Sequence, residues 1–149
     1  MQINHATLAD LDQLVPLFDG YRQFYRQPSD LNGARTFLHE RLTNNDSVIF
    51  LAKDDEPLGF TQLFPSFSSV SMRRLWILND LFVAPNGRQR GVGAALLERA
   101  RQWASATNAK GLVLETEISN INAQRLYEHS GWKREDETYH YFLATEFRG

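Results

Sequence analysis

Apolar residues recur every three or four positions in two segments near the N-terminus, which is typical of one face of a helix. The first segment spans 8–25 and follows a capping box at 7–10, with Asp in place of the usual Glu. Pro16 interrupts its pattern, so we expect either a kink there or a helix that effectively begins later. The Pro-Ser-Asp sequence at 28–30 indicates a break and a new N-cap, after which apolar positions outline a second helix that ends near 44–45.

Strand patterns fill most of the middle of the chain. Apolar runs predict a short first strand at 1–6 and longer strands at 47–53, 58–67 and 75–83. Pro65 lies inside the third of these strands, which predicts that the strand frays or bulges.

Helices and strands alternate in the second half of the chain. The pattern predicts a helix at 91–107, a strand at 111–116, a helix at 121–130, and closing strands at 132–134 and 138–145. The fold class is therefore α/β (α+β), with a central mixed, twisted sheet of six to seven strands flanked by about four helices.

Length and charge restrict the classes of function. A chain of 149 residues suits a single domain over 1–149. A net charge of −2 and a pI near 6.1 give no general attraction for nucleic acid or membranes, and the arginines at 73–74 and 88–90 form only local clusters. No apolar run has the length of a membrane span, and the N-terminus is too polar for a signal peptide. A cytoplasmic location is the resulting expectation.

Cysteine and histidine usage argues against several kinds of site. The chain contains no cysteine, so disulfides, thiolate metal sites and an acyl-cysteine intermediate are excluded. The four histidines show no ligand spacing, and we expect no metal.

A glycine-spaced loop follows the strand at 75–83. Its sequence from Arg88 to Gly93 fits R-x-x-G-x-G and opens a helix. Because glycine has no Cβ, the backbone N–H groups at this helix start can approach a ligand closely, and the helix dipole favours phosphate there. The simpler alternative is an ordinary strand-loop-helix connection with incidental glycines. The loop is neither a Walker loop, because Ala94 follows the second glycine, nor a G-x-G-x-x-G fingerprint.

A second motif runs from Asn120 to Trp132 and has the form N-x-x-A-x-x-L-Y-x-x-x-G-W. On a helix, Ala123 and Tyr127 share one face, Asn120 is suited to the N-cap and Gly131 to the C-cap. The same residues also describe a capped amphipathic helix with a half-buried tyrosine and no further role.

The two motifs, their order and their separation resemble the GNAT N-acetyltransferase superfamily across most of the chain, most closely from Asn79 to Trp132. Within it, residues 79–83 and 139–142 look closest to the spermidine/spermine and thialysine acetyltransferase branch. The resemblance implies a single GNAT-like domain in which the parallel strands at 75–83 and 111–116 splay apart to leave a wedge. A homodimer is compatible with it.

The resemblance also implies the position of the co-substrate, acetyl-CoA. Pantetheine would lie in the wedge against the backbone of the central strand, and the pyrophosphate would lie on the N–H groups of the loop. The residues expected to contact acetyl-CoA are Leu81, Phe82, Val83, Arg88, Gln89, Arg90, Gly91, Val92, Gly93, Ala94, Asn120 and Ala123.

Two residues are candidates for the chemistry. An alkylamine with a pKa near 10.4 must lose a proton before it attacks a thioester, and Asp80 is the first candidate to accept that proton. A carboxylate that only binds a cationic substrate is an equal alternative role for Asp80. Glu115 and Glu117 are the alternatives as base, and Asn79 stands where the matching branch commonly has glutamate. Tyr127 is suited to protonate the departing thiolate. Without a cysteine, transfer should be direct within a ternary complex.

The expected acceptor is a small primary amine, cationic or lysine-like. Tyr21, Tyr25, Asn79 and Glu115 are the expected substrate-binding residues, and Phe24, Tyr139 and Tyr141 are further candidates for aromatic walls. The competing interpretations are a protein, peptide or amino-acid N-acetyltransferase and a catalytically silent acetyl-CoA-binding regulatory module.

Overall fold

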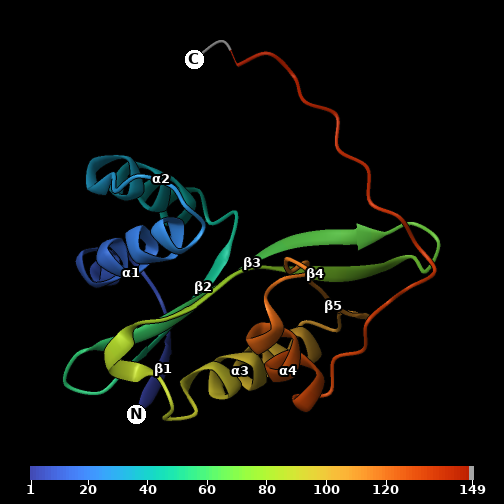
Figure 1. Ribbon diagram of the computed structural model, residues 1–149. Coiled ribbons are helices and arrows are strands. Elements are labelled where there is room, and N and C mark those ends of the chain that lie inside the picture. The colour runs from blue at the N-terminus through green and yellow to red at the C-terminus, as the bar shows by residue number, and fades with distance from the viewer. Residues whose placement is uncertain (148–149) are drawn as a thin grey trace.

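A computed structural model describes residues 1–147 and shows one mixed sheet between two layers of helices (Figure 1). The described residues form a five-stranded sheet in the order β1-β2-β3-β4-β5. Neighbours from β1 to β4 are antiparallel, whereas β4 and β5 are parallel. The strands are β1 Gln2–His5, β2 Val48–Lys53, β3 Pro57–Ser68, β4 Arg73–Val83 and β5 Gly111–Val113.

Helices α1 (Leu11–Phe24) and α2 (Leu31–Asn44) cover one face of the sheet (Figure 1). The predicted capping box is confirmed, because the Thr7 side chain accepts from Ala9 N–H while Asp10 accepts from Thr7 N–H. It caps a 3-10 turn that leads into α1, so the α-helix begins later than the apolar pattern, and Pro16 is accommodated inside it. The buried side chains between this helical layer and the sheet include Leu14, Phe18, Leu38, Ile49, Leu51 and Phe60.

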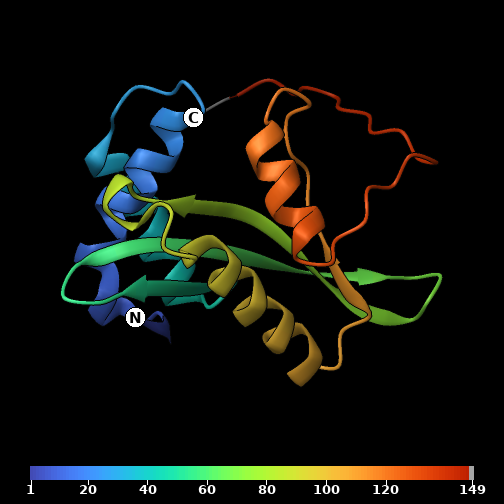
Figure 2. The same ribbon diagram turned by 60° about the horizontal axis from the view of Figure 1, so that its bottom comes forward.

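Helix α3 (Val92–Ala106) covers the opposite face, with α4 (Ile121–His129) beside it (Figure 2). Val92, Leu96 and Ala100 recur along one side of α3 and are buried, which is the pattern of a helix face packed on a sheet. They pack in one cluster with Phe50, Leu63, Trp76 and Leu78 of the sheet. The four predicted helices are thus confirmed in the part of the chain that the structure describes.

A β-bulge interrupts the pairing of β3 with β4. Gln62 pairs with Asp80, but the next residue, Leu63, pairs with Leu78, so Asn79 is an extra residue on β4. An extra residue exchanges the two faces of the strand beyond it. Accordingly Leu78 faces the α3 layer, whereas Phe82, four residues on, packs with the α1 layer. Pro65 itself pairs with Trp76 inside a continuous β3, so the predicted fraying or bulging of this strand at Pro65 is not found. The bulge lies opposite Gln62 and Leu63, and its extra residue is on β4.

The parallel pair splays, as expected. β4 and β5 pair only at Leu75 with Gly111, Trp76 with Leu112 and Ile77 with Val113. Beyond that point β4 continues to Val83 while β5 ends. The edge of β4 from residue 78 to 83 is therefore not paired with β5.

The prediction of six to seven strands is wrong for the described residues, which form five. Segment 111–116 is a strand only as far as Val113, and neither 132–134 nor 138–145 forms one. A strand needs a neighbour for its backbone hydrogen bonds, and the C-terminal segment instead runs away from the body (Figure 1). Its apolar residues are therefore exposed, Tyr141 to 93%. Over residues 1–147, no helix is long and apolar enough to span a membrane.

Candidate active site

The open edge of β4 supplies one side of the candidate site. Leu81, Phe82 and Val83 pair with β3 on one side, and the other side faces the wedge left by the short β5. The Phe82 side chain packs against α1, where a Cβ on Gly20 would lie 3.0 Å from the Phe82 ring. The backbone groups on the unpaired side of this stretch are thus available to a ligand. An extended chain with amide groups, such as pantetheine, fits such an edge.

The loop before α3 presents backbone N–H groups to solvent. Gln89 and Gly91 both have positive φ, 61° and 75°, and this bends the chain tightly before the helix. The first hydrogen bond of helix α3 runs from Ala95 N–H to Gly91 O at 3.0 Å. The N–H groups of Val92 to Ala94 come before this bond and have no acceptor within the helix. A Cβ on Gly91 would meet open space. The exposed helix start fits a pyrophosphate.

Arg88 and Arg90 brace this loop. Arg88 Nε donates to Val83 O at 3.3 Å, while Arg90 pairs with Asp54 at 2.7 Å and donates to Asn86 O at 3.2 Å. The N–H of Glu56, together with Arg90, lowers the pKa of the Asp54 carboxyl. The two arginines therefore have structural partners, and both side chains remain exposed.

The second motif packs α4 against the loop helix. The Asn120 side chain accepts from Ala123 N–H at 3.2 Å, which confirms the predicted N-cap. A Cβ on Gly93 would lie 3.0 Å from Leu126 Cδ2, so glycine permits the close approach of α3 and α4. The Tyr127 ring lies on the same helix and contacts Trp132, with ring centroids 6.1 Å apart. This packing orients Tyr127.

Gly91→Asp is expected to weaken acetyl-CoA binding by about 10- to 100-fold, because it adds a negative charge at a helix N-terminus that should hold a pyrophosphate. The matched control is Gly91→Asn, which has the same shape and tolerates the same positive φ but carries no charge. Isothermal titration calorimetry with CoA compares the two. Equal affinities for Gly91→Asp and Gly91→Asn would rule out the loop as the phosphate site.

Asp80 is the buried carboxylate of the site, with an exposed fraction of only 2%. Gln62 Nε2 donates to Asp80 Oδ2 at 2.6 Å, and Asn79 Nδ2 donates to Oδ1 at 2.7 Å. Burial raises the pKa of the carboxyl, and these two hydrogen bonds counteract part of the rise. A carboxylate held in this way is a stronger proton acceptor than one at the surface.

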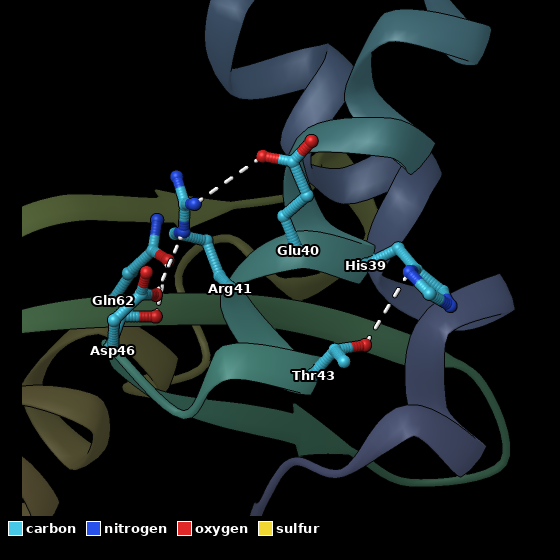
Figure 3. Close-up of polar contacts among 7 residues, drawn as sticks. His39, Glu40, Arg41, Thr43, Asp46 and Gln62 are labelled. Carbon is cyan, nitrogen blue, oxygen red and sulfur yellow. Dashed lines mark hydrogen bonds and ion pairs between the residues drawn. The ribbon is translucent and has the colours of Figure 1, made fainter.

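Gln62 and Ser47 complete a buried polar chain behind Asp80. Ser47 Oγ donates to Gln62 Oε1 at 2.8 Å, so the amide presents its N–H to Asp80. Figure 3 shows the Gln62 side chain near the end of α2, beside Asp46 and Arg41, whose ion pair measures 2.8 Å. The sequence reasoning missed Ser47 and Gln62. A polar pair, Thr61-Gln62, inside an otherwise apolar strand was the available signal.

Tyr21 and Tyr25 lie near Asp80, and both interact electrostatically with Tyr127. Tyr21 of α1 donates to Asn79 O at 3.0 Å, and its ring lies 5.1 Å from that of Tyr25. Burial and then the Asp80 carboxylate raise the pKa of Tyr21. Burial and then Tyr25 raise the pKa of Tyr127 to about 12. Tyr21 of α1, Tyr25 at the C-cap of α1 and Tyr127 of α4 thus form one cluster, which we call the tyrosine cluster.

Glu117, and not Glu115, is the carboxylate next to this cluster. It pairs with Arg26 at 3.2 Å and contributes, after burial, to the raised pKa of Tyr25. Glu115 is instead paired with His140 of the C-terminal segment. Tyr139 and Tyr141 are about nine-tenths exposed on that segment and Phe24 is also exposed, so the structure does not bring these aromatic residues into a wall.

The fold and the site define an acetyltransferase of the GNAT type. Residues 14–132 match the model of the Acetyltransferase (GNAT) family, and the chain belongs to this family. An uncharacterized N-acetyltransferase of Bacillus subtilis, YhfO, is 49% identical over 144 residues, which cover 96% of this chain and 97% of that protein. The crystal structure of a probable acetyltransferase is 44% identical, with a TM-score of 0.92 over 99% of both chains.

The relatives do not support the narrower resemblance to polyamine and thialysine acetyltransferases. The names of YhfO and of the crystallised relative identify no acceptor. A more distant relative, streptothricin acetyltransferase A of Bacillus subtilis, is 26% identical over 141 residues, 85% of this chain and 80% of that protein. No group of three or more metal-ligating side chains occurs in residues 1–147.

Proposed function

We propose that this acetyltransferase transfers the acetyl group of acetyl-CoA directly to a primary amine of a small cationic molecule. The observation that supports the proposal is the tyrosine cluster beside a buried carboxylate: Tyr21 donates to Asn79 O, next to the buried Asp80, and interacts electrostatically with both Asp80 and Tyr127. The family uses acetyl-CoA as its co-substrate. The open edge and the loop before α3 fit its pantetheine and pyrophosphate.

Asp80 is proposed to accept the proton of the acceptor ammonium. Its raised pKa brings it closer to the operating pH than an ordinary Asp, which improves general-base catalysis. Gln62 and Asn79 each occupy one carboxylate oxygen, so further lone pairs remain for the ammonium or a bridging water. In the alternative role Asp80 only binds the cation, and the amine loses its proton to solvent.

Tyr127 is proposed to donate to the sulfur as the C–S bond breaks. A pKa of about 12 keeps its hydroxyl protonated at neutral pH, so the donor is always in place. The neutral amine forms the new C–N bond as the C–S bond breaks, and the sulfur leaves as the thiol of CoA with the proton of Tyr127. The proton then lost by the nitrogen restores the Tyr127 hydroxyl, and the proton that Asp80 took from the ammonium passes to solvent. Holding amine and thioester together supplies much of the remaining acceleration.

The charges around the tyrosine cluster favour a cationic acceptor. Asp80 and Glu117 are the carboxylates that act on Tyr25, and aromatic rings attract ammonium groups by roughly 0.5–2 kcal/mol per contact. The relative named for streptothricin supports an amine-bearing small molecule as the acceptor.

A panel of amines tests the acceptor. CoA release is measured with a thiol reagent, to which this cysteine-free chain contributes no background. The panel comprises polyamines, lysine analogues, amino sugars, neutral amino acids and a peptide with a free N-terminus. We expect the highest kcat/KM for an acceptor with a second positive charge. A preference for neutral amino acids or for the peptide would replace the proposed acceptor, and no CoA release with any amine would favour a silent acetyl-CoA-binding module.

Glu117→Gln is expected to raise KM for cationic acceptors about two- to five-fold with little change in kcat, because a partly exposed charge contributes roughly 0.5–1 kcal/mol. Glu115→Gln is the matched control, since it makes the same chemical change two residues away on a carboxylate paired with His140. Steady-state kinetics with the best cationic acceptor compares the two. Equal KM values would remove Glu117 from the acceptor site.

A further inference from the structure

An ion pair joins the connection between α1 and α2 to the segment that follows β5. Arg26 Nη2 donates to both carboxylate oxygens of Glu117 at 3.2 Å, although the two residues are 91 positions apart in the chain. The connection and the segment before α4 lie at the same end of the molecule, at the top of Figure 2. The two side chains are 73% and 42% exposed. Exposed ion pairs contribute little free energy, so another cation can replace the arginine.

The backbone fixes the position of Arg26. Its N–H donates to Gln23 O at 2.9 Å, and the N–H of Gln27 donates to Arg22 O at 3.0 Å, which is the Schellman motif at the end of α1. Arg26 has the left-handed φ of this motif, 68°, a conformation that favours glycine because a Cβ makes it strained. The backbone geometry therefore does not require an arginine here. What the arginine adds is its contact with Glu117.

The backbone around Glu117 is fixed as well. The N–H of Asn120 donates to Glu117 O at 3.0 Å, so a turn precedes α4. Gln124 Nε2 donates to the same carbonyl oxygen at 3.3 Å and to Ile118 O at 2.8 Å. The carboxylate of Glu117 is thus presented from a braced turn, whatever its side chain binds.

The ion pair can open without a change in the fold. The connection that carries Arg26 is anchored on the buried Asp19, which accepts from Asp30 N–H at 2.8 Å and from Ser29 Oγ at 2.7 Å. Only the side chain of Arg26 needs to rotate, and a guanidinium group that is released at the surface is hydrated. The pair is therefore an exchangeable contact between two fixed walls.

This contact borders the tyrosine cluster. Tyr25 precedes Arg26, and its ring lies 5.1 Å from that of Tyr21. Burial is the largest cause of the raised pKa of Tyr25; Glu117 and Asp80 add to the rise, and Arg26 opposes it. Tyr25 is thus close to a buried carboxylate and to an exposed one. The exposed carboxylate already holds a cation, which belongs to the protein itself.

We propose that Arg26 occupies the position of the acceptor's second cation, and that a dicationic acceptor displaces Arg26 from Glu117 when it binds. Arg26 is then a specificity-determining residue. An acceptor with one ammonium group leaves the ion pair intact and gains nothing from Glu117. An acceptor with two ammonium groups gains the contact with Glu117, but the loss of the ion pair limits its affinity. The inference rests on the acceptor site proposed above, and it does not depend on which group transfers a proton.

NMR titration of the CoA-bound protein tests the displacement. Putrescine and butylamine are the probes, because they differ only in the second ammonium group. The Nε–H signal of Arg26, identified by its loss in Arg26→Gln, reports on the ion pair. We expect putrescine to shift this signal, whereas butylamine should not. A signal that responds to neither amine, or equally to both, would overturn the proposal.

Arg26→Gln is expected to lower the Kd for putrescine by about two- to five-fold, the contribution of an exposed ion pair, and to leave the Kd for butylamine unchanged. Arg35→Gln is the matched control, because it makes the same change in another exposed pair, with Asp12 at 2.7 Å, and should alter neither Kd. In a Glu117→Gln background, the effect of Arg26→Gln should vanish. An unchanged or higher Kd for putrescine in Arg26→Gln would contradict displacement.

The same competition relates this result to the kinetics of Glu117→Gln. In the wild type, that substitution removes only the part of the attraction that remains after Arg26 has been displaced. In an Arg26→Gln background, it should therefore raise the Kd for putrescine by a larger factor than in the wild type. An equal factor in both backgrounds would show that Arg26 and the acceptor do not compete.

These measurements concern binding, so they separate this inference from the proposed reaction. If no amine releases CoA but putrescine still displaces Arg26, the proposed reaction fails and the displacement stands. If amines are acetylated but the wild type and Arg26→Gln bind putrescine equally, the displacement alone fails.

Discussion

Tyr127→Phe is expected to lower kcat by about 10²- to 10⁴-fold, the usual contribution of a general acid, with little change in acetyl-CoA affinity. The substitution removes only the hydroxyl. The ring should keep its contact with Trp132, whose centroid lies 6.1 Å away, so α4 should remain in place. Loss of rate without loss of binding is the pattern of an interaction made only in the transition state.

Single-turnover kinetics gives the clearest measurement, because it isolates the transfer step from product release. Tyr25→Phe is the matched control: Tyr25 lies in the same cluster and interacts electrostatically with Tyr127, but it has no assigned proton transfer. An unchanged single-turnover rate in Tyr127→Phe would reduce Tyr127 to a packing residue. Equal losses in both variants would indicate that the cluster acts through its shape.

Local chemistry made the loop before α3 and the start of α4 predictable. A capping Asn at 120, a loop with two spaced glycines and a helix start after it are short-range features, and each has a direct structural outcome. The same holds for the capping box at Thr7 and for the apolar face of α3. These features need no knowledge of distant residues.

The environment of Asp80 was not predictable, because it depends on long-range register. Asn79 is a bulged residue. If the strand alternated regularly through Asn79, Asp80 would lie two residues after Leu78 and on the same face, among the apolar side chains next to α3. The bulge directs Asp80 to the α1 side, near Tyr21. Gln62 reaches Asp80 only through this pairing.

The C-terminal strands were predicted from composition alone, and composition does not supply a partner. The residues at 138–145 have a strand pattern but no neighbouring strand within the single described chain. The position of Glu117, rather than Glu115, next to the tyrosine cluster has a related cause. β5 ends at Val113, so the alternation of side chains expected from a longer strand does not hold for the residues that follow.

Asp80→Asn is expected to lower kcat by about 10²-fold or more if Asp80 is the general base. In the wild type, the acidic limb of the pH–rate profile should lie above the range of an ordinary Asp, near 4, because burial raises the pKa of this carboxyl. In Asp80→Asn that limb should disappear. If the variant keeps activity with an unchanged acidic limb, the titration belongs to another group. Asp80 would then only bind the cationic substrate, and the KM for that substrate should rise.

The same substitution is expected not to reduce the free energy of unfolding at neutral pH. The folded-state pKa of Asp80 is raised, so its favourable contribution is complete below the unfolded pKa and is lost as pH rises through the folded pKa. At neutral pH a buried carboxylate therefore costs stability, and asparagine removes that cost. The exposed Asn79 amide can rotate to accept from the new amide.

Asp19→Asn should behave in the opposite way and is the matched control. Asp19 is also buried, but it accepts hydrogen bonds from the N–H of Asp30 at 2.8 Å and from the side chains of Ser29 and Gln23. The bond from Asp30 is the largest cause of the lowered pKa of Asp19. Its contribution is present above the unfolded pKa and is lost as pH falls through the folded pKa. We expect Asp19→Asn to lose about 1–3 kcal/mol at neutral pH. Thermal denaturation at neutral and acidic pH compares the two variants. If Asp80→Asn lost as much free energy of unfolding at neutral pH as Asp19→Asn, Asp80 would stabilise the fold, and the expected destabilisation by its buried charge would be absent.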